Sequence, residues 1–331
     1  MEEKEKIKIT KKGIMRYSTM EKNSFPFVYL ILLFPILQFL VFWLYVNFSS
    51  IVMSFTDEFG HLDLSNFKNV FESFKNGVDY ADRTLDPALM LKHSILLWLN
   101  IHLVAFLISV FTAYMLTKHM IFSKGFRLIY QIPVIVGGVV FSSLMRSMYQ
   151  ADGPVLDLFK ALGWFENLPK FAQTDGLLGT KDTAFITLMI QAFVLTISGG
   201  SMIIAGAFMR IPDEIFESAK LEGCGFFREA FGIAIPCIWP TISTLLIFSL
   251  CSFFVCDYNF YLYSDGTGRN GIVSIGFRLY KFTTTMASYE GDVGGLYNYA
   301  SAFGMFITLI TLPLVLGGRW LLRKLNDDVE F

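Results

Sequence analysis

The chain is poor in charged residues: only 17% of its 331 residues are Asp, Glu, Lys or Arg, whereas 54% are hydrophobic. A soluble domain carries about a quarter charged residues, so this composition argues against one. Six long stretches lack charge almost completely, and each is long enough to cross a bilayer as a helix. A core helix of a soluble protein would be shorter and would show a polar face. The predicted spans cover residues 25–53, 94–117, 127–148, 183–209, 237–263 and 297–318.

Cysteine and histidine are also scarce, with four of each. The four cysteines are Cys224, Cys237, Cys251 and Cys256, and none lies in a predicted outer loop, which excludes an extracellular disulfide framework. They have no histidine nearby, so no metal site is expected, and we interpret them as small packing residues. The lone His102 in the second span is interpreted as a hydrogen-bonded core residue rather than a ligand.

Motifs of catalysis are missing as well. No glycine is followed directly by lysine, so the chain has no G-x-x-x-x-G-K-[ST] phosphate cradle and cannot hydrolyse ATP by that means. The patterns H-E-x-x-H and G-x-S-x-G are absent too. We therefore expect a protein that is not an enzyme and binds no cofactor of its own. Nothing points to nucleic acid.

The distribution of basic residues predicts the orientation. Most lysines and arginines fall in the two tails and in the two loops on the same side, and the positive-inside rule makes that side cytoplasmic. The first span has no small-residue cleavage pattern after it, so we expect it to be retained rather than removed as a signal peptide. The predicted organisation is a basic cytoplasmic arm (1–24), a membrane domain (25–325) and a short cytoplasmic tail (326–331), in a bacterial-type plasma membrane.

The cytoplasmic loop 210–236 contains a patterned segment, "ESAKLEGCGFFREAFGIAIP", between two apolar spans. Pro212 suits the first turn of a helix and Gly223 suits its end, which predicts a helix of about ten residues. Its apolar residues are three to four apart and are expected to rest on the membrane domain: Ile211, Ile215, Phe216 and Ala219. Its charged residues are expected to face away: Glu214, Glu217, Lys220 and Glu222. A plain linker needs no such pattern, whereas a docking surface does.

This segment resembles the EAA loop of ABC importer permeases, written E-A-A, three residues, G, nine residues, I-x-L-P. The spacing matches, with Ser218 in place of an alanine, Glu222 in place of an aspartate and Ile235 in place of a leucine. In that family the loop is a coupling helix that inserts into the cytoplasmic ATPase. The resemblance implies that the ATPase contact is made by Glu214, Glu217, Ser218, Ala219, Glu222 and Gly223, with Pro236 ending the motif.

The resemblance extends to the carbohydrate branch of these permeases over roughly residues 25–325. "LSNFKNVF" is similar to a segment of that branch, and so is the third span with the loop after it, although Asp157 replaces the usual asparagine. "SDGTG" matches a third segment weakly, because Thr267 and Gly268 replace its second glycine and its proline. The resemblance implies an all-α fold of six transmembrane helices with a cytoplasmic coupling helix. The partners that it implies are membrane lipid, a second permease subunit, a cytoplasmic ATPase dimer that carries ATP and Mg, an external solute-binding protein and a carbohydrate.

Candidate residues for the solute path lie in spans four and five. Asp257, Tyr258 and Asn259 close the fifth span with hydrogen-bonding groups and an aromatic face, which suit a sugar. Asp257 can equally mark the outer membrane interface. The resemblance adds Ala192, Thr196, Gly199, Phe253 and Cys256. Arg146 and Tyr149, at the end of span three, are weaker candidates for an outer gate.

Two other functions stay open. A gradient-driven secondary transporter of a small polar solute would need buried carboxylates or broken helices at mid-membrane, and spans one, two, four and six contain no charge. A membrane-embedded enzyme would need a cluster of histidines or carboxylates at one face. The favoured hypothesis is half of the translocation path of an ATP-driven importer, working by alternating access on a carbohydrate of oligosaccharide size.

Small residues and short amphipathic segments give further expectations. Most of the small residues of spans three and four are expected to let helices approach closely: Gly137, Gly138, Gly199, Gly200 and Ser201. Outside the spans, Leu64, Phe67, Phe71 and Phe74 predict a helix on the membrane or on a neighbouring element. A second outer helix is predicted to begin at Pro154 and end at Gly163.

Overall fold

The computed structural model describes residues 19–57, 59–76, 86–118, 123–168, 170–179, 181–255, 260–263, 272–287 and 294–326. Within these ranges the regular elements are helices, joined by turns and one isolated bridge between Thr56 and Leu62. The first part of the chain forms α1 (Thr19–Gln38), the π-helical turn η1 (Phe39–Leu44), α2 (Tyr45–Ser54), α3 (Ser65–Asn76), α4 (Pro87–Leu99), the π-helical turn η2 (Asn100–Ala105), α5 (Phe106–Thr117), α6 (Ser123–Val136), α7 (Gly138–Tyr149), α8 (Pro154–Ala161), η3 (Phe165–Asn167) and α9 (Lys170–Asp175). The second part forms α10 (Lys181–Phe208), α11 (Asp213–Leu221), α12 (Phe226–Glu229), the π-helical turn η4 (Ala230–Ala234), α13 (Ile235–Cys237), α14 (Trp239–Cys251), α15 (Phe260–Tyr263), α16 (Ile275–Ala287) and α17 (Gly294–Asn326).

The lengths and composition of the helices in the described ranges are those of a multi-pass membrane protein. Four are long and apolar enough to cross a bilayer: Phe27–Ser54, Pro87–Thr117, Thr183–Phe208 and Gly295–Lys324. Two bent pairs bring the number to six if each pair counts as one span. The predicted all-α membrane fold with six spans is therefore confirmed, but the third and fifth spans are not straight.

The third span bends at Gly137, which separates α6 from α7. The segment Gly125–Val136 before this residue and the segment Gly138–Ala161 after it, which includes α8, are inclined by 96°. Gly137 has a φ of +87°, which other residues adopt only with strain, and an added Cβ would meet no atom within 4 Å. The expectation that Gly137 serves close packing is therefore wrong, because its role is to turn the chain. Gly200 does serve packing, since its Cβ would lie 3.2 Å from Ser109 Oγ of α5.

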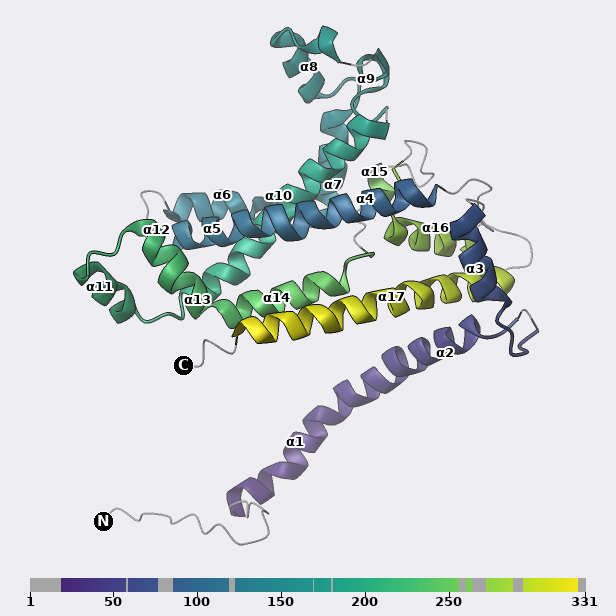
Figure 1. Ribbon diagram of the computed structural model, residues 1–331, viewed down its shortest axis with the longest axis horizontal. Helices are drawn as coiled ribbons and strands as arrows, with labels where there is room; N and C mark the ends of the chain where they lie inside the picture. Colours follow the sequence, from purple (N-terminus) through teal and green to yellow (C-terminus); the bar gives the residue numbers. More distant parts are fainter. Residues whose placement is uncertain are drawn as a thin grey trace.

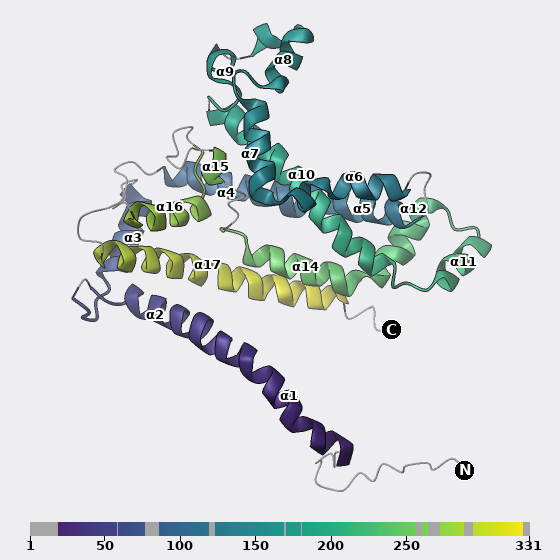
Figure 2. The same ribbon diagram turned by 180° about the vertical axis from the view of Figure 1, so that it is seen from behind.

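The first helix lies apart from the rest of the bundle. Figures 1 and 2 show α1 diverging from the other helices, whereas α2 lies beside α17. Nearly every side chain of residues 27–53 is exposed, although these residues are apolar on all sides of the helix. A helix that is apolar all round requires lipid or another protein as its surroundings.

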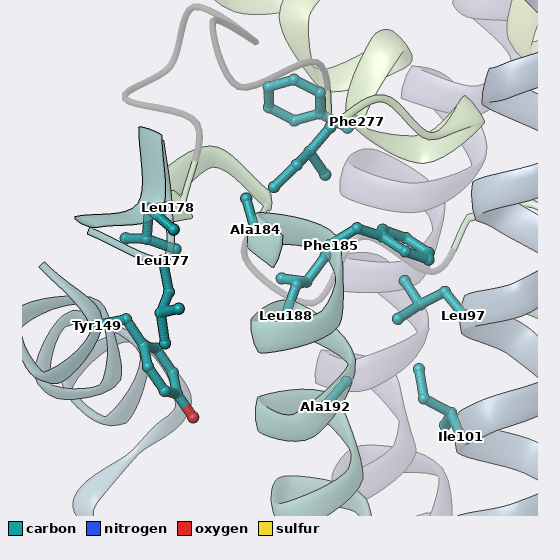
Figure 3. Close-up of a cluster of buried hydrophobic side chains, with 12 residues drawn as sticks. Leu97, Ile101, Tyr149, Leu177, Leu178, Ala184, Phe185, Leu188, Ala192 and Phe277 are labelled. Atoms are coloured by element: carbon teal, nitrogen blue, oxygen red, sulfur yellow. The ribbon is translucent and has the colours of Figure 1, made fainter. Parts of the chain in front are cut away.

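A buried cluster joins α4, α7 and α10 to the unit that projects from the ends of α7 and α10. Figure 3 shows Leu188 and Ala192 of α10 facing Leu97 and Ile101 of α4 and η2. The projecting unit contains α8 and α9 (Figure 1) and is attached by the Leu177 N–H, which donates to the Tyr149 carbonyl at 2.9 Å. The predicted helix that begins at Pro154 is present there as α8. Tyr149 is buried in this cluster, which places a candidate gate residue in a packed position.

The predicted outer helix with the phenylalanines is α3, and it packs on α17. The Phe74 ring stacks on Phe303 at a centroid distance of 5.5 Å. Asp63 begins the helix by accepting a hydrogen bond from the Ser65 N–H at 3.1 Å, and the hydrogen bonds from Ser65 lower the pKa of this carboxyl. Phe71 is exposed, so only part of the phenylalanine pattern faces the bundle.

Removing one hydroxyl from this contact tests how tightly α3 is held. Tyr299 of α17 donates a buried hydrogen bond to Ser73 Oγ of α3 at 3.0 Å. Tyr299→Phe is expected to lower the free energy of unfolding by about 1 kcal/mol, measured by thermal unfolding in detergent. The control is Tyr297→Phe, on the same helix with a half-exposed side chain, and it is expected to cause no measurable change. Equal shifts for the two variants would contradict the assignment.

Candidate functional site

The helix α11 begins where the sequence pattern predicts it. Pro212 is the N-cap, with φ −59° and ψ 137°, and the helix follows from Asp213. Asp213 and Glu214 occupy the first turn, where the helix macrodipole favours negative charge, and Lys220 occupies the last turn, where it favours positive charge. These local preferences favour a helix that begins and ends at these residues.

The end of α11 is fixed by Gly223. Its φ of +72° lies in the left-handed region, which glycine adopts without cost. The Gly223 N–H donates to the Lys220 carbonyl at 3.0 Å, and the Cys224 N–H donates to the Ala219 carbonyl at 2.9 Å. This pair of bonds is a Schellman motif, which satisfies the last carbonyls of the helix and turns the chain sharply. The predicted short helix is therefore present, with nine residues.

One face of α11 rests on the bundle. Ala219 is buried, and Phe216 and Ile211 pack against a buried cluster formed by α5, α10 and the α12–α14 segment. Ile215 is 39% exposed, so its expected place on this face is wrong. Around the helix Ala219 lies between the two, about 60° from Phe216 and about 40° from Ile215. The bundle covers the Phe216 side of Ala219 and leaves the Ile215 side open.

The other face of α11 carries most of the residues expected at the ATPase contact, whereas Ala219, also expected there, lies on the bundle face. Exposed side chains occur at Glu214, Glu217, Ser218, Lys220 and Glu222. The Ser218 hydroxyl donates to the Glu214 carbonyl at 2.8 Å. Leu221 is 91% exposed and is not among the residues predicted for this contact. Its signal was available in the sequence, because it is a large apolar residue outside the buried stripe of the helix.

The chain returns to the bundle through a second bent pair. The helical segment Phe226–Cys237 is continuous through η4 and is inclined by 71° to α14. Pro236 lies in α13, two residues before the break at Ile238, and is partly buried. The fifth span therefore consists of a short entry helix and a longer membrane helix, rather than one helix from residue 237 to 263.

The solute-path candidates are placed in different surroundings. Ala192 is fully buried in the cluster of Figure 3 and does not face an open space. Thr196 donates its hydroxyl to the Ala192 carbonyl, and Gly199 lies close to Val134 of α6, where a Cβ would be 3.6 Å away. Phe253 packs on Trp98 with a ring-centroid distance of 4.7 Å. The remaining candidates, Cys256, Asp257, Tyr258 and Asn259, lie outside the described residues.

A polar and aromatic group between α4 and α14 was not expected. The Trp98 indole N–H donates to the Ser249 carbonyl at 2.8 Å, and His102 Nε2 lies 3.1 Å from Ser252 Oγ. His102 is thus hydrogen-bonded, as predicted, and it lies in the π-helical turn η2. Such turns often occur at functional sites. The signal for this group was a tryptophan and a histidine four residues apart in an otherwise apolar span.

A polar cavity of about 280 Å³ lies between the α2–α3 connection and the start of α17. Two asparagines fasten its walls: Asn66 Nδ2 donates to the Thr56 carbonyl and Asn298 Nδ2 to the Asp57 carbonyl, each at 2.8 Å. Their amides are thus occupied by backbone contacts that join α3 and α17 to the connection. Among the described residues, no three His, Cys, Asp or Glu side chains are placed to hold a metal ion.

Comparison with known proteins gives consistent relatives. No family model matches the chain. The chain is 27% identical to a probable ABC transporter permease protein of Pyrococcus horikoshii over 294 aligned residues. The alignment covers 86% of this chain and 93% of the relative. It is 22% identical to protein LplB of Bacillus subtilis, over 97% of this chain and 95% of LplB. It is 24% identical to the polygalacturonan/rhamnogalacturonan transport system permease protein YteP of Bacillus subtilis, over 91% and 89% of the two chains.

Solved structures agree in fold. A bacterial ABC transporter involved in the import of the acidic polysaccharide alginate matches with a TM-score of 0.72 at 20% identity, over 93% of this chain and 99% of the other. The alginate transporter in complex with its pentasaccharide-bound periplasmic protein matches with a TM-score of 0.71 at 20% identity, over 92% and 96% of the two chains. The predicted resemblance is therefore confirmed, and over most of its length this chain is similar to permease subunits of ABC carbohydrate importers.

Proposed function

We propose that the chain is the permease subunit of an ATP-driven importer and forms half of the translocation path for a carbohydrate of oligosaccharide size. The single observation that carries this proposal is α11. It is a short helix with one face on the bundle and a charged face open to a partner, and its end is fixed by Gly223. Relatives that are named for polysaccharide and oligosaccharide transport support a carbohydrate as the solute.

The proposal includes an orientation and a set of partners. The basic tails and α11 face the cytoplasm, where α11 contacts an ATPase dimer that carries ATP and Mg. A second permease subunit completes the path, and the exposed apolar helix α1–α2 is the part of the chain that most needs such a neighbour or lipid. An external solute-binding protein delivers the sugar on the opposite side, where the α8–α9 unit projects.

The chain itself carries out no covalent chemistry in this function. Closure of the ATPase on ATP moves α11, and the helices that α11 contacts change the side on which the path is open. Only interactions that differ between the two states of the path can drive this change. The clusters that hold α11 against α5 and the α12–α14 segment are therefore the parts of the fold that transmit the movement.

The first experiment is to purify the tagged chain with its partners from its own membranes and to measure ATP hydrolysis in proteoliposomes. We expect an ATPase to co-purify and its activity to rise when an oligosaccharide and its binding protein are added. Uptake that continues without ATP and follows an ion gradient would contradict the proposal and favour a secondary transporter.

Charge reversal on α11 tests the contact directly. Glu217→Lys places a positive charge on the exposed face, and we expect at least a tenfold weaker association of the ATPase, measured by titration of the purified subunit. The control is Glu166→Lys, an exposed charge reversal in the projecting unit, which lies away from α11 (Figure 1). Equal affinities for the two variants would show that Glu217 lies outside the contact.

A further inference from the structure

Three segments meet at the end of α5, around the ammonium group of Lys118. The residue follows the last turn of α5 and is its C-cap. Its Nζ lies 3.9 Å from the centroid of the Phe216 ring of α11 and 5.5 Å from the centroid of the Tyr114 ring of α5. The same Nζ forms an ion pair with Glu229 Oε1 at the end of α12. One cation therefore contacts the helix of the proposed ATPase contact, the second span and the entry to the fifth span.

The carboxylate of this ion pair is buried, Lys118 is partly buried, and the pair has a further partner. Glu229 is 5% exposed and Tyr114 is 2% exposed, and the Tyr114 hydroxyl donates to Glu229 Oε1 at 2.9 Å. A carboxylate removed from water is stable only where cations and donors replace its hydration. Here Lys118 and Tyr114 supply that replacement, so the position of the carboxylate fixes the position of the ammonium.

The aromatic contacts then fix α11. A cation over the face of an aromatic ring is attracted to the ring, and the attraction is stronger when water is excluded. The Lys118 ammonium lies over Phe216, which belongs to the buried stripe of α11. The Tyr114 ring also contacts Phe226 of α12 at a centroid distance of 5.3 Å. The side chains of α5, α11 and α12 therefore share one network at this point.

The surroundings of α11 explain why such a joint is needed. The chain is exposed just before the helix, at Met209 and Arg210, and just after it, at Glu222 and Gly223. A Cβ atom added at Gly223 would meet no atom within 4 Å, so no neighbouring side chain packs against this side of the turn. Without a firm contact to the bundle, a push on α11 would bend the connecting turns instead of moving the membrane helices.

We propose that Lys118 and Glu229 are positioning residues that join α11 and α12 to the end of α5, so that the three move as one body when the ATPase moves α11. This inference rests on the proposed function for its consequence. The joint itself is a property of the isolated chain and can be measured without the partner.

The first test measures the position of α11 in the purified chain in nanodiscs. Spin labels are placed at Leu221 of α11 and Leu107 of α5, both exposed, in a background in which the native cysteines are replaced by serine. Double electron–electron resonance is expected to give one narrow distribution of the distance between the two labels in the otherwise unaltered chain. Lys118→Met and Glu229→Gln are each expected to broaden it, because each leaves the joint without one of its charges.

Two further variants keep the test decisive. If a single substitution prevents folding, the double variant Lys118→Met, Glu229→Gln carries no unpaired buried charge and takes its place. The control is Lys68→Met, Glu72→Gln, which removes the exposed ion pair of α3, 3.9 Å between Nζ and Oε1. A folded double variant with a broad distribution supports the joint. A distribution as narrow as that of the control overturns it.

The second test uses the assembled transporter. We expect Glu229→Gln to retain the ATPase partner and the basal rate of ATP hydrolysis. The increase in that rate caused by solute is expected to be at least tenfold smaller than in the unaltered chain. A purely structural role would instead lower the melting temperature and lose the partner. Full stimulation in this variant overturns the inference. If no ATPase co-purifies with the unaltered chain, the proposed function fails, and the distance measurement still decides whether the joint exists.

Discussion

Replacing Gly223 with proline is expected to abolish the rise in ATP hydrolysis caused by solute, while the membrane helices stay folded. Proline holds φ near −65°, whereas Gly223 has a φ of +72°. The substitution also removes the N–H that donates to the Lys220 carbonyl at 3.0 Å. The Schellman end of α11 is then lost, and with it the direction in which α12 leaves the turn. ATP hydrolysis in proteoliposomes measures the effect, and circular dichroism and gel filtration report on the fold.

A neighbouring glycine supplies the control for this variant. Gly225 has a φ of −78°, which any residue adopts, and an added Cβ would meet no atom within 4 Å. Gly225→Ala is therefore expected to keep normal stimulation by solute. Normal stimulation in Gly223→Pro would show that the left-handed end of α11 is not required for coupling. An equal loss in Gly225→Ala would contradict the assignment of the effect to Gly223.

Replacing Phe303 with alanine is expected to cost about 3–5 kcal/mol of unfolding free energy, the largest stability effect that we predict. Phe303 of α17 is 1% exposed, and its ring lies against Phe74 of α3 and Phe282 of α16 at centroid distances of 5.5 Å and 5.6 Å. Its removal opens a cavity where three helices meet. Loss of these contacts also costs energy in a membrane protein, because packing rather than water drives the association of its helices.

Thermal unfolding of the purified chain in detergent measures this effect. The matched control is Leu309→Ala, on the same helix but with a side chain that is 56% exposed. We expect the control to change stability little, because it removes few contacts. Similar melting temperatures for the two variants would show that α3 and α16 are not held through Phe303.

The local features of the loop followed from the sequence. Pro212 and Gly223 predicted both ends of α11, because a helix N-terminus and a left-handed turn each need particular backbone angles at one residue. Ile215 shows the limit of this approach. Its spacing from Ala219 fits a residue at the edge of the buried face, which can be covered or exposed. Only the position of the bundle decides that its side chain is exposed.

The bends in the third and fifth spans show a second limit. A charge-free stretch predicts that a segment crosses the membrane, because bilayer thickness sets the length of a helix. It does not predict that Gly137 adopts a φ of +87° and that the segments before and after it are inclined by 96°. A glycine in an apolar run fits close packing and a turn equally well, and the tertiary structure selects between them.

The network around Lys118 could not be predicted from the sequence either, because its members are far apart in the chain. Tyr114 and Lys118 end one span, and Glu229 follows 111 residues after Lys118. No local pattern connects residues at that separation.

The sequence by itself determined that this is an all-α membrane protein and that a capped helix interrupts its apolar stretches, because each of these depends on length, charge and backbone angles along a continuous segment. Only the tertiary structure decided which side of α11 is free, where the spans bend and how Lys118 joins α11 to the bundle. These depend on contacts between segments that are distant in the chain.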